Sequence, residues 1–486
     1  MDLDHDACYR AVELRDARFD GRFFTAVKTT GTYCRPVCPA RTPRSENVTF
    51  YPTAAAAQEA GFRPCLRCRP ETAPDKGAWR GTSNTVSRAL ALIELGALDE
   101  GSVDTLAGRL GLGERQLRRL CRQHLGASPI AVAQTRRVLL AKQLIHETSL
   151  PMAEIAFASG FGSIRRFNET FLALYGRAPC ALRRRSGREI PAGPGGEISL
   201  LLRYQPPYDW PGMLESLRLR AVPGIERVGE SCYSRTIKLD GRQGMVSVRP
   251  DAGHALRARI RFPKLSALPG IIARLRRVFD LAADPLAISA HLGKDPVLAP
   301  LVTARPGLRV PGAWDGFELA IGAVLGQQRS VTAAVRLVGC LVVTYGEPLA
   351  EPDHELTHAF PRPEVLARAD LTTLGLGRSR AATLSAVAAA AVADPDVLCA
   401  SRGLDEAIQR LRSIPGMDEW TAHYIALRQL REPDAFPAAD VGLGCALAHL
   451  EGRRRSSREL VARAEPWRPW RAYAAQHLWA SPRRVE

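Results

Sequence analysis

Four cysteines near the amino terminus have the spacing of a metal site. Cys34 and Cys38 form a C-x3-C pair, and Cys65 and Cys68 form a C-x2-C pair, with 26 residues between the two pairs. Two such pairs supply four thiolates that can close tetrahedrally around one zinc ion. A disulfide framework is the weaker interpretation, because the remaining cysteines are scattered and the total of 11 is odd. The sequence therefore predicts one Zn²⁺ site with these four ligands.

The surroundings of these cysteines are strongly basic. Six arginines lie within or next to the two pairs: Arg35, Arg41, Arg44, Arg63, Arg67 and Arg69. A surface of this charge attracts phosphate groups. A zinc ion that only holds a small domain together is the simpler interpretation of a four-cysteine site, but it leaves the arginines unexplained. We therefore expect a small zinc domain that contacts DNA.

Three stretches around the cysteines resemble the amino-terminal domain of the Ada DNA-alkylation response family. The shared patterns are T-T-G-x-[FY]-C-R-P-x-C, E-N-V-x-F-Y and G-F-R-P-C-x-R-C, over about 70 residues. The resemblance implies that Cys34 accepts a methyl group from a methylphosphotriester in DNA, while the other three cysteines remain zinc ligands. It also implies DNA contacts for Thr30, Arg41 and Arg63, whereas Pro39 stands where the relative has another arginine.

Such a methyl transfer is consistent with the chemistry of zinc-bound thiolates. Zinc keeps a ligand sulfur deprotonated at neutral pH, which is its nucleophilic form. Four thiolates on Zn²⁺ carry a formal charge of about −2, and methylation of one leaves about −1, which reduces repulsion against the DNA backbone. We therefore expect an irreversible, single-turnover sensor. A redox or zinc sensor is the alternative, which oxidation or metal loss would switch instead.

The composition of the chain also points to nucleic acid. The 486 residues are enough for three or four domains, and the net charge is +17. An Ala- and Arg-rich composition accounts for part of this excess, but not for its coincidence with the motifs. No signal peptide, lipidation motif or transmembrane run is visible, and the many unpaired cysteines suit a reducing compartment. We expect a cytoplasmic monomer that binds double-stranded DNA and no membrane.

Two segments after the cysteines have the layout of helix-turn-helix units. Residues 103–126 predict two short helices that meet at Gly111 or Gly113. Residues 150–179 repeat this layout, and a helix near 129–147 joins the two units. Tandem units of this kind can read successive segments of the major groove. An ordinary helical bundle with a basic, solvated face is the alternative.

These segments resemble the DNA-binding domain of AraC-type transcription regulators. The A-x3-G-F and F-x3-Y-G-x2-P patterns match the family signature within a stretch of roughly 100 residues. We expect Gln116 on the second helix of the first unit, and Arg165 and Arg166 on that of the second unit, to face DNA. The resemblance further implies a transcription activator with RNA polymerase as a partner.

The pattern changes after a basic run that is followed by Gly and Pro at residues 183–197. Four strands are expected downstream, at 198–204, 233–239, 245–248 and 256–262, with a turn at 240–244 and helices at 210–222 and 268–281. This predicts a small antiparallel sheet covered by helices. From Pro311 onward, strands are no longer expected, and helical patterns continue to Trp479.

A helix-hairpin-helix pattern lies within this helical block. The stretch L-R-S-I-P-G-M-D-E-W-T-A-H-Y-I-A-L predicts a helix that ends in a Pro-Gly hairpin at Gly416 and restarts at once. The new helix N-terminus presents backbone N–H groups that suit a DNA phosphate without reading sequence. Asp440 follows in an otherwise apolar or small setting. An aspartate there is usually a solvated loop residue or a helix cap, but its position after the hairpin favours catalysis.

Residues 198–480 resemble the AlkA-type 3-methyladenine glycosylases of the helix-hairpin-helix superfamily. The shared stretches are Y-Q-P-P-Y-D-W, L-G-Q, P-G-x3-W-T-A-x-Y-x-A-L-R and W-R-P-W-R-x-Y-A-x2-H-L-W. The resemblance implies that Asp440 is a buried catalytic carboxylate and that Trp420, Tyr424 and Trp479 line the pocket for an extruded base. Relatives that cleave the backbone have a Schiff-base lysine at the position of Trp420, so a monofunctional enzyme is expected.

Two positions depart from the glycosylase pattern. Asp418 stands where the hairpin usually has a second glycine, and its carboxylate would oppose a nearby phosphate. Gln328 aligns with the apolar residue that wedges into the emptied base space, so we expect a polar wedge and altered base flipping. Trp467 and Trp470 are expected to be ordinary core residues.

The expected fold class is a multidomain α+β protein. Its parts are a small four-cysteine zinc domain, an all-α tandem helix-turn-helix domain, a linker, a small antiparallel α+β domain and an all-α helix-hairpin-helix glycosylase domain. The predicted boundaries are, in the same order, 1–76, 82–186, 187–197, 198–302 and 303–486.

The combined hypothesis is an alkylation-response protein with two activities. It would accept a methyl group on a zinc-bound cysteine and thereby become a transcription activator, and it would excise alkylated bases such as 3-methyladenine. The P-C-H-R motif of alkylguanine methyltransferases is absent, since Cys180 lies in P-C-A-L. The alternative is a transcription regulator whose glycosylase-like half only binds DNA.

Overall fold

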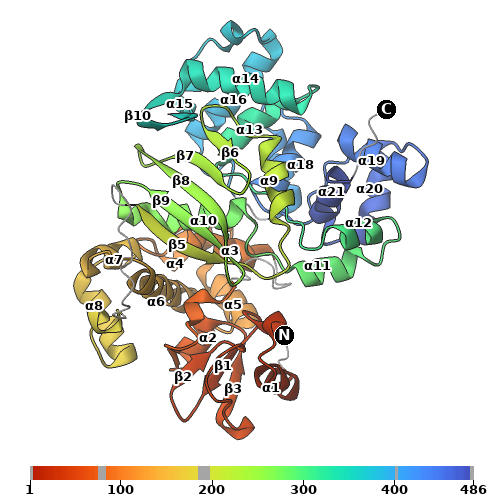
Figure 1. The fold of residues 1–486 in the computed structure, drawn as a ribbon. Helices are drawn as coiled ribbons and strands as arrows, with labels where there is room; N and C mark the ends of the chain where they lie inside the picture. The colour runs from red at the N-terminus through yellow and green to blue at the C-terminus, as the bar shows by residue number, and fades with distance from the viewer. Residues whose placement is uncertain (1–3, 75–83, 184–196, 400–402, 482–486) are drawn as a thin grey trace. The chain divides into compact units, whose positions relative to one another are not determined.

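The computed structural model describes residues 4–74, 84–183, 197–399 and 403–481 (Figure 1). The chain divides into two units, Met1–Gln205 with Asp251–Ala273, and Pro206–Pro250 with Arg274–Glu486. The first unit holds the cysteine and helix-turn-helix segments, and the second holds the helix-hairpin-helix. Of the predicted linker, residues 187–196 lie outside the described residues.

A four-stranded sheet brings the two cysteine pairs together. β2 (Thr32–Cys34) pairs in parallel with β4 (Arg63–Pro64), with Tyr33 opposite Pro64. This register sets Cys34 beside Cys65, whose N–H donates to the Tyr33 carbonyl at 3.0 Å. The strand order is β3-β1-β2-β4, and two helices pack against the sheet. The remaining elements are β1 (Phe24–Val27), β3 (Val48–Tyr51), α1 (His5–Glu13) and α2 (Ala54–Glu59).

Both predicted helix-turn-helix units are present in the first unit. The first consists of α4 (Val103–Arg109) and α5 (Glu114–Leu125), and the second of α7 (Met152–Ala158) and α8 (Ile164–Tyr175). The turns place Gly111 at φ +68° and Gly160 at φ +87°, in the left-handed region that glycine favours. α6 (Pro129–Glu147) joins the units, and α3 (Asn84–Glu94) precedes them. Their buried apolar faces include Leu106, Leu117, Cys121, Phe167 and Phe171.

The antiparallel strands expected between residues 198 and 262 are confirmed. In the first unit β5 (Ile198–Arg203) pairs with β9 (Ala255–Arg261). In the second unit β7 (Tyr233–Leu239) pairs with β8 (Arg242–Asp251) and with β6 (Glu226–Val228), a short strand that was not predicted. The β7–β8 turn is tighter than expected, because residues 242–244 belong to β8. The two predicted helices are shorter in the structure: α9 (Trp210–Arg218) and α10 (Leu268–Val278).

The rest of the second unit is mainly helical, as expected. Its helices are α11 (Pro285–Leu292), α12 (Leu298–Ala304), α13 (Gly316–Gly326), α14 (Val331–Tyr345), α15 (Pro363–Leu366), α16 (Arg378–Ala393), α17 (Leu404–Arg412), α18 (Glu419–Arg428), α19 (Val441–Glu451), α20 (Ser457–Ala464) and α21 (Arg471–Trp479).

The prediction that strands end before Pro311 is wrong. β10 (Glu347–Asp353) and β11 (Leu356–Ala359) form an antiparallel hairpin, and the Thr236 hydroxyl of β7 donates to the His358 carbonyl at 2.7 Å. β10 contains two prolines and three acidic residues, and most of its residues are exposed, so its sequence is typical of a loop. Prolines are tolerated in such an irregular strand pair because they sit at its edge or at a bulge.

Candidate functional site

The four cysteines form the predicted zinc site. The Sγ atoms of Cys34, Cys38, Cys65 and Cys68 all lie within 4.8 Å of one another. A tetrahedral zinc site with Zn–S bonds of about 2.3 Å fits this spacing. The backbone N–H groups of Arg35 and Arg67 point to Cys68 Sγ and Cys65 Sγ, each at 3.4 Å, as suits anionic sulfur. The residues therefore fit one Zn²⁺ ion.

Accessibility differs among the four ligands. Cys34, the expected methyl acceptor, is 9% exposed, whereas Cys38 is half-buried and is the most accessible of the four. Cys34 is the last residue of β2, so the sheet fixes its backbone. This difference in exposure could not be predicted from the sequence, because exposure depends on how the surrounding loops fold.

Two of the six arginines near the cysteines are internal rather than DNA-facing. Arg35 donates to Asp20 at 2.8 Å and to the Thr72 hydroxyl at 2.6 Å. Arg69 is bound by Glu71 and Glu147. The expectation that all six form one phosphate-attracting surface is therefore wrong, because buried carboxylates neutralise these two. Arg41, Arg44 and Arg67 are exposed, and Arg63 is half-buried.

The other predicted DNA contacts of the first unit are accessible. Thr30 is exposed, and its hydroxyl lies 2.7 Å from that of Thr32. Gln116 lies on the first exposed turn of α5. Arg165 and Arg166 begin α8 and are both exposed, although Arg165 pairs with Glu169 at 2.8 Å. Such an exposed pair is weak, so it leaves Arg165 able to bind phosphate.

The hairpin between α17 and α18 has the expected tight turn. Gly416 has φ +83°, and a Cβ atom there would lie 1.9 Å from the Thr383 hydroxyl of α16. Asp418 is the N-cap of α18, and its carboxylate accepts the Thr421 N–H at 2.8 Å. This carboxylate thus occupies part of the helix N-terminus that was expected to bind phosphate. The negative charge that the sequence places at Asp418 therefore lies where a bound phosphate was expected.

The turn after α13 is fastened to this hairpin. Gln327 donates to the Gly416 carbonyl at 3.3 Å and to the Thr421 hydroxyl at 3.0 Å. Arg380 donates to the Gln327 carbonyl at 2.9 Å. The next residue, Gln328, is exposed at φ +57°. The sequence pattern assigned the wedge role to Gln328, but the contacts of Gln327 and Arg380 that hold this turn could not be predicted, because they join separate elements.

Asp440 lies at the N-terminus of α19, on the wall of a large cavity of the second unit. Its Oδ1 accepts the Leu443 N–H and the Trp479 indole N–H, both at 2.9 Å. Its Oδ2 accepts the Trp420 indole N–H at 2.9 Å. Asp440 is thus a helix cap as well as a cavity residue, and it is half-buried, not buried as expected. Three donors fix the plane of its carboxylate.

The three predicted pocket aromatics line the same cavity. Trp420 and Tyr424 stack on each other, with ring centroids 5.3 Å apart and an interplanar angle of 11°. A base therefore cannot insert between these two rings as they stand. Trp479 comes from α21 and is linked to Trp420 through Asp440, since both indoles donate to that carboxylate.

Several arginines of this cavity were not predicted, and two of them, Arg220 and Arg428, act on its aromatic residues. The buried Arg428 guanidinium lies 5.5 Å from the Tyr424 ring centroid and 5.4 Å from that of Trp479. Burial lowers its pKa to about 10. Burial acts to raise the pKa of Tyr424, but Arg220 and Arg428 outweigh it, so that pKa lies below its usual value. Arg428 ends the W-T-A-x-Y-x-A-L-R stretch, which was the available signal.

The two tryptophans expected in the core differ. Trp467 is 1% exposed, and its indole N–H donates to Asp295 at 2.8 Å. Trp470 is half-buried and contacts Tyr473 edge to face, with centroids 6.0 Å apart. Neither lines the Asp440 cavity.

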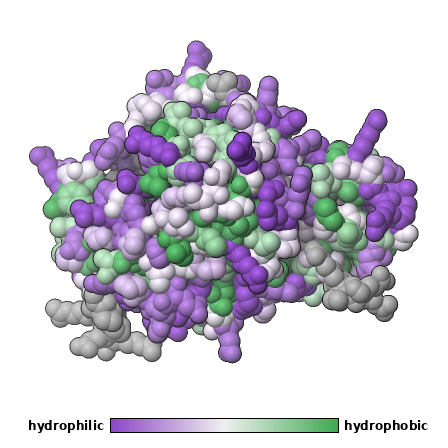
Figure 2. All heavy atoms as spheres, turned by 90° about the horizontal axis from the view of Figure 1, so that it is seen from above, coloured by the Kyte–Doolittle hydropathy of each residue, from purple (hydrophilic) through white to green (hydrophobic). Residues whose placement is uncertain are grey.

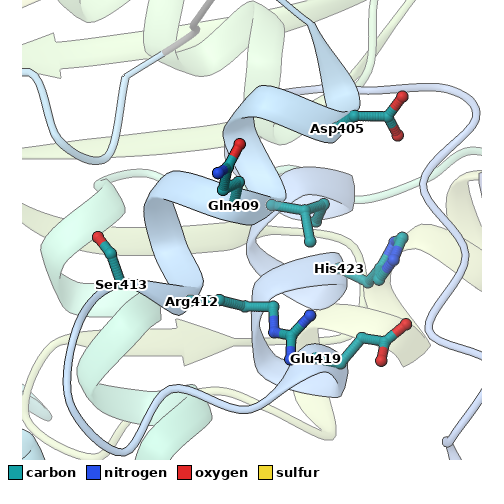
Figure 3. Close-up of a pocket in the computed structure, with 7 residues that line it drawn as sticks. Asp405, Gln409, Arg412, Ser413, Glu419 and His423 are labelled. Carbon is teal, nitrogen blue, oxygen red and sulfur yellow. The ribbon is translucent and has the colours of Figure 1, made fainter.

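A second, polar hollow lies between α17 and α18. Figure 3 shows Arg412 of α17 pointing toward Glu419 of α18, with Asp405 and His423 around the same hollow. Burial lowers the pKa of His423, which favours the neutral imidazole. None of the predicted site residues lines this hollow.

The molecular surface is mixed in character. On the face shown in Figure 2, hydrophobic residues occur in small groups among hydrophilic ones. Across the described ranges, no helix combines the length and hydrophobicity that a membrane span requires.

The fold and the sites define a helix-hairpin-helix base-excision protein joined to an Ada-type metal-binding domain. Models of four families match the chain: the metal binding domain of Ada at residues 7–71, a helix-turn-helix domain at 106–185, the AlkA N-terminal domain at 199–315, and the HhH-GPD superfamily base excision DNA repair proteins at 321–472.

Known relatives cover the chain in full and in part. A "probable bifunctional transcriptional activator/DNA repair enzyme AlkA" of Mycobacterium tuberculosis is 43% identical over 483 residues, 99% of this chain and 97% of that protein. The chain therefore belongs to this family of bifunctional transcriptional activator/DNA repair enzymes. "DNA-3-methyladenine glycosylase 2" of Escherichia coli is 35% identical over 282 residues, 57% of this chain and 95% of that protein.

A solved structure supports the fold of the second half. A 3-methyladenine DNA-glycosylase from Archaeoglobus fulgidus superposes with a TM-score of 0.52 at 22% identity, over 57% of this chain and 96% of that one. The four-part architecture expected from the sequence and its single zinc site are thus confirmed. The helix-turn-helix and HhH-GPD domains support binding of double-stranded DNA.

Proposed function

We propose that this protein responds to DNA alkylation in two ways: it hydrolyses the N-glycosidic bond of alkylated bases such as 3-methyladenine, and it accepts methyl groups from DNA methylphosphotriesters to become a transcription activator. The observation that carries the first activity is the carboxylate of Asp440, held by two indoles and one backbone N–H at the wall of an aromatic cavity. The four-cysteine site carries the second.

The glycosylase step follows from the charge of the substrate. A base such as N3-methyladenine is cationic, so its bond to the sugar breaks with little help from an acid. Asp440 stabilises the oxocarbenium-like sugar electrostatically and orients water, which adds to the sugar carbon and loses a proton. The base leaves as a neutral molecule. Trp420 occupies the place of a Schiff-base lysine, so the enzyme is monofunctional and leaves the backbone intact.

The aromatic rings favour a cationic base over a neutral one. Each contact of a cation with an electron-rich ring face is worth about 0.5–2 kcal/mol. Trp420 stacks on the uncharged ring of Tyr424. Arg428 already lies near the faces of Tyr424 and Trp479. We therefore assign the main contact with the extruded base to Trp420, with the other two rings at its side.

The first test is release of free base from DNA that contains 3-methyladenine or 7-methylguanine. We expect the wild-type protein to release both, and Asp440→Asn to lower the single-turnover rate by at least about 100-fold, since the amide lacks the charge that stabilises the sugar. Asp405→Asn, an exposed aspartate outside the Asp440 cavity, is the matched control. Lack of release by the wild-type protein, with DNA binding intact, would leave the alternative of a regulator whose second half only binds DNA.

The methyl transfer is a displacement at carbon. Bound zinc supplies a thiolate that is nucleophilic at neutral pH. The Cys34 sulfur forms a bond to the methyl carbon, the carbon–oxygen bond of the phosphotriester breaks, and a phosphodiester anion leaves. Cys38, Cys65 and Cys68 stay as ligands. Thr30, Arg41 and Arg63 then position the DNA backbone.

Peptide mass mapping tests this assignment. After reaction with methylphosphotriester DNA, we expect one methyl group on the peptide that contains Cys34. Cys38 is the informative comparison, because it is the more accessible sulfur. A methyl group on Cys38 instead would reassign the acceptor, and oxidation or zinc loss without methylation would favour a redox or zinc sensor.

The regulatory activity requires further partners. The tandem helix-turn-helix units would bind promoter DNA through Gln116, Arg165 and Arg166, with RNA polymerase as the protein partner. Gly416 would approach a phosphate of the damaged strand at the hairpin. We propose that the protein acts as a monomer in the cytoplasm, and that the Gln328 wedge changes base flipping without abolishing it.

A further inference from the structure

A buried ion pair joins the cysteine domain to helix α6. The Lys142 ammonium is 0% exposed and donates to Glu71 at 2.8 Å, and the Glu71 side chain is 1% exposed. The same ammonium donates to the backbone carbonyl of Cys65 at 2.9 Å. A charge from the DNA-binding domain therefore contacts the backbone of a zinc ligand directly.

A second pair continues the contact along α6. Arg69, the residue after Cys68, donates to Glu71 at 2.9 Å and to Glu147 at 3.1 Å. Burial acts to raise the pKa of Glu71, but Lys142 and Arg69 outweigh it, so that pKa lies below its usual value. Lys142, Glu71, Arg69 and Glu147 thus form one network of alternating charge that starts at two zinc ligands.

The far end of this network reaches strand β5. Glu147 Oε2 accepts the Leu201 N–H at 3.0 Å, and Gln143 donates to the Leu201 carbonyl at 2.9 Å and to Glu147 at 3.0 Å. Side chains of α6 thereby bind both backbone groups of one strand residue. β5 lies in the segment that matches the AlkA N-terminal domain.

Attachment of the cysteine domain does not by itself require these buried charges. A neighbouring contact already fastens the same domain, where Ala55 and Ala56 pack against Ala127 and the Thr53 hydroxyl donates to the Leu125 carbonyl at 2.8 Å. A protein in which apolar side chains replace a buried ion pair is often as stable as the original protein or more stable. A charged pair also responds to its surroundings, because its interaction energy changes when the charge of a nearby group changes.

We propose that residues 142–147 of α6 couple the state of the four-cysteine cluster to strand β5. The cluster with zinc is formally anionic and attracts Lys142 and Arg69, and loss of negative charge weakens this attraction. Arg69 then holds Glu147 less firmly, and Glu147 in turn holds the Leu201 N–H less firmly. The Leu201 N–H is therefore a local reporter of the cluster. The methylation arm of this coupling rests on the proposed methyl transfer, whereas the zinc arm does not.

Hydrogen exchange of the full-length, zinc-loaded protein tests the coupling. We expect removal of zinc by a chelator under reducing conditions to speed exchange of the peptide with Leu201 severalfold, and methylphosphotriester DNA to do so to a smaller extent. In Lys142→Met we expect this peptide to exchange fast even with zinc bound. Zinc removal or methylphosphotriester DNA should then change its exchange rate less than twofold. Lys28→Met, which removes one exposed lysine from the same domain, is the matched control and responds as wild type.

Glu147→Gln provides a second variant if Lys142→Met fails to fold. It keeps the shape of the side chain but removes the charge that Arg69 binds, so exchange at Leu201 becomes insensitive to zinc. An unchanged exchange rate in the wild-type protein after zinc removal overturns the proposal, and so does a full response in a folded Lys142→Met or Glu147→Gln. A response to zinc but not to methylphosphotriester DNA keeps the coupling and contradicts the methyl transfer.

Discussion

At the residue scale, Asp440 combines the two interpretations that its sequence context allowed. It is a helix cap through the Leu443 N–H, and it lies at the wall of the aromatic cavity. Its indole partners could not be predicted, because Trp420 and Trp479 are 59 residues apart in the chain and lie on separate helices. The sequence pattern assigned them to base contact only. In the structure they also position the carboxylate.

Removal of one indole N–H tests this positioning role. We expect Trp479→Phe, which keeps an aromatic ring but lacks the donor to Asp440, to lower the single-turnover rate of base release by roughly 10-fold to 100-fold, because misplaced electrostatic groups stabilise the transition state poorly. Affinity for damaged DNA should change less than about twofold, since an aromatic ring remains. Single-turnover release and fluorescence anisotropy measure the two quantities separately.

Trp470→Phe serves as the control for this variant. Trp470 does not line the Asp440 cavity, so its rate of release should match that of the wild type. Equal losses of affinity and rate in Trp479→Phe would assign Trp479 to base binding alone.

At the element scale, the sequence predicted helices well where the local residue pattern alone determines the structure. α6 spans the residues expected for the joining helix, and α5 begins directly after the predicted turn at Gly113. In the structure, Ser128 and Ser163 are the N-caps of α6 and α8. The β10–β11 hairpin was missed, because β10 contains two prolines and mostly exposed residues, and because the hairpin is held through the contact of β11 with β7. The internal role of Arg35 was hidden for the same reason, since Asp20 is its partner only after folding.

The hairpin between α17 and α18 allows a prediction about Asp418. The carboxylate caps α18 but places a negative charge where phosphate is expected. We expect Asp418→Ser, which keeps a capping oxygen and removes the charge, to tighten binding to undamaged duplex DNA by about threefold to tenfold at low salt. Anisotropy titrations at several salt concentrations measure this change. Asp405→Ser on α17 is the matched control, and an unchanged affinity in Asp418→Ser would place the bound phosphate away from the α18 N-terminus.

At the scale of the whole molecule, the two chemistries lie in different units. All four zinc ligands belong to Met1–Gln205, whereas Asp440 and the three predicted aromatics, Trp420, Tyr424 and Trp479, belong to Arg274–Glu486. The order of these parts could be predicted, because each carries its own motif. The domain boundaries remain predictions. The contacts of α6 with both the cysteine domain and β5 could not be predicted, since no motif encodes them.

This separation predicts that zinc removal divides the two activities. A chelator added under reducing conditions should abolish methyl acceptance by the full-length protein, because the four sulfurs lose the ion that keeps them as thiolates. Release of 3-methyladenine should stay within about twofold of its original rate, because no zinc ligand contributes to the Asp440 cavity. Both activities are measured on the same sample, by mass mapping and by release of free base, with zinc added back as the control. If base release fell in parallel with methyl acceptance and returned with zinc, the cysteine domain would have to support catalysis in the second unit directly.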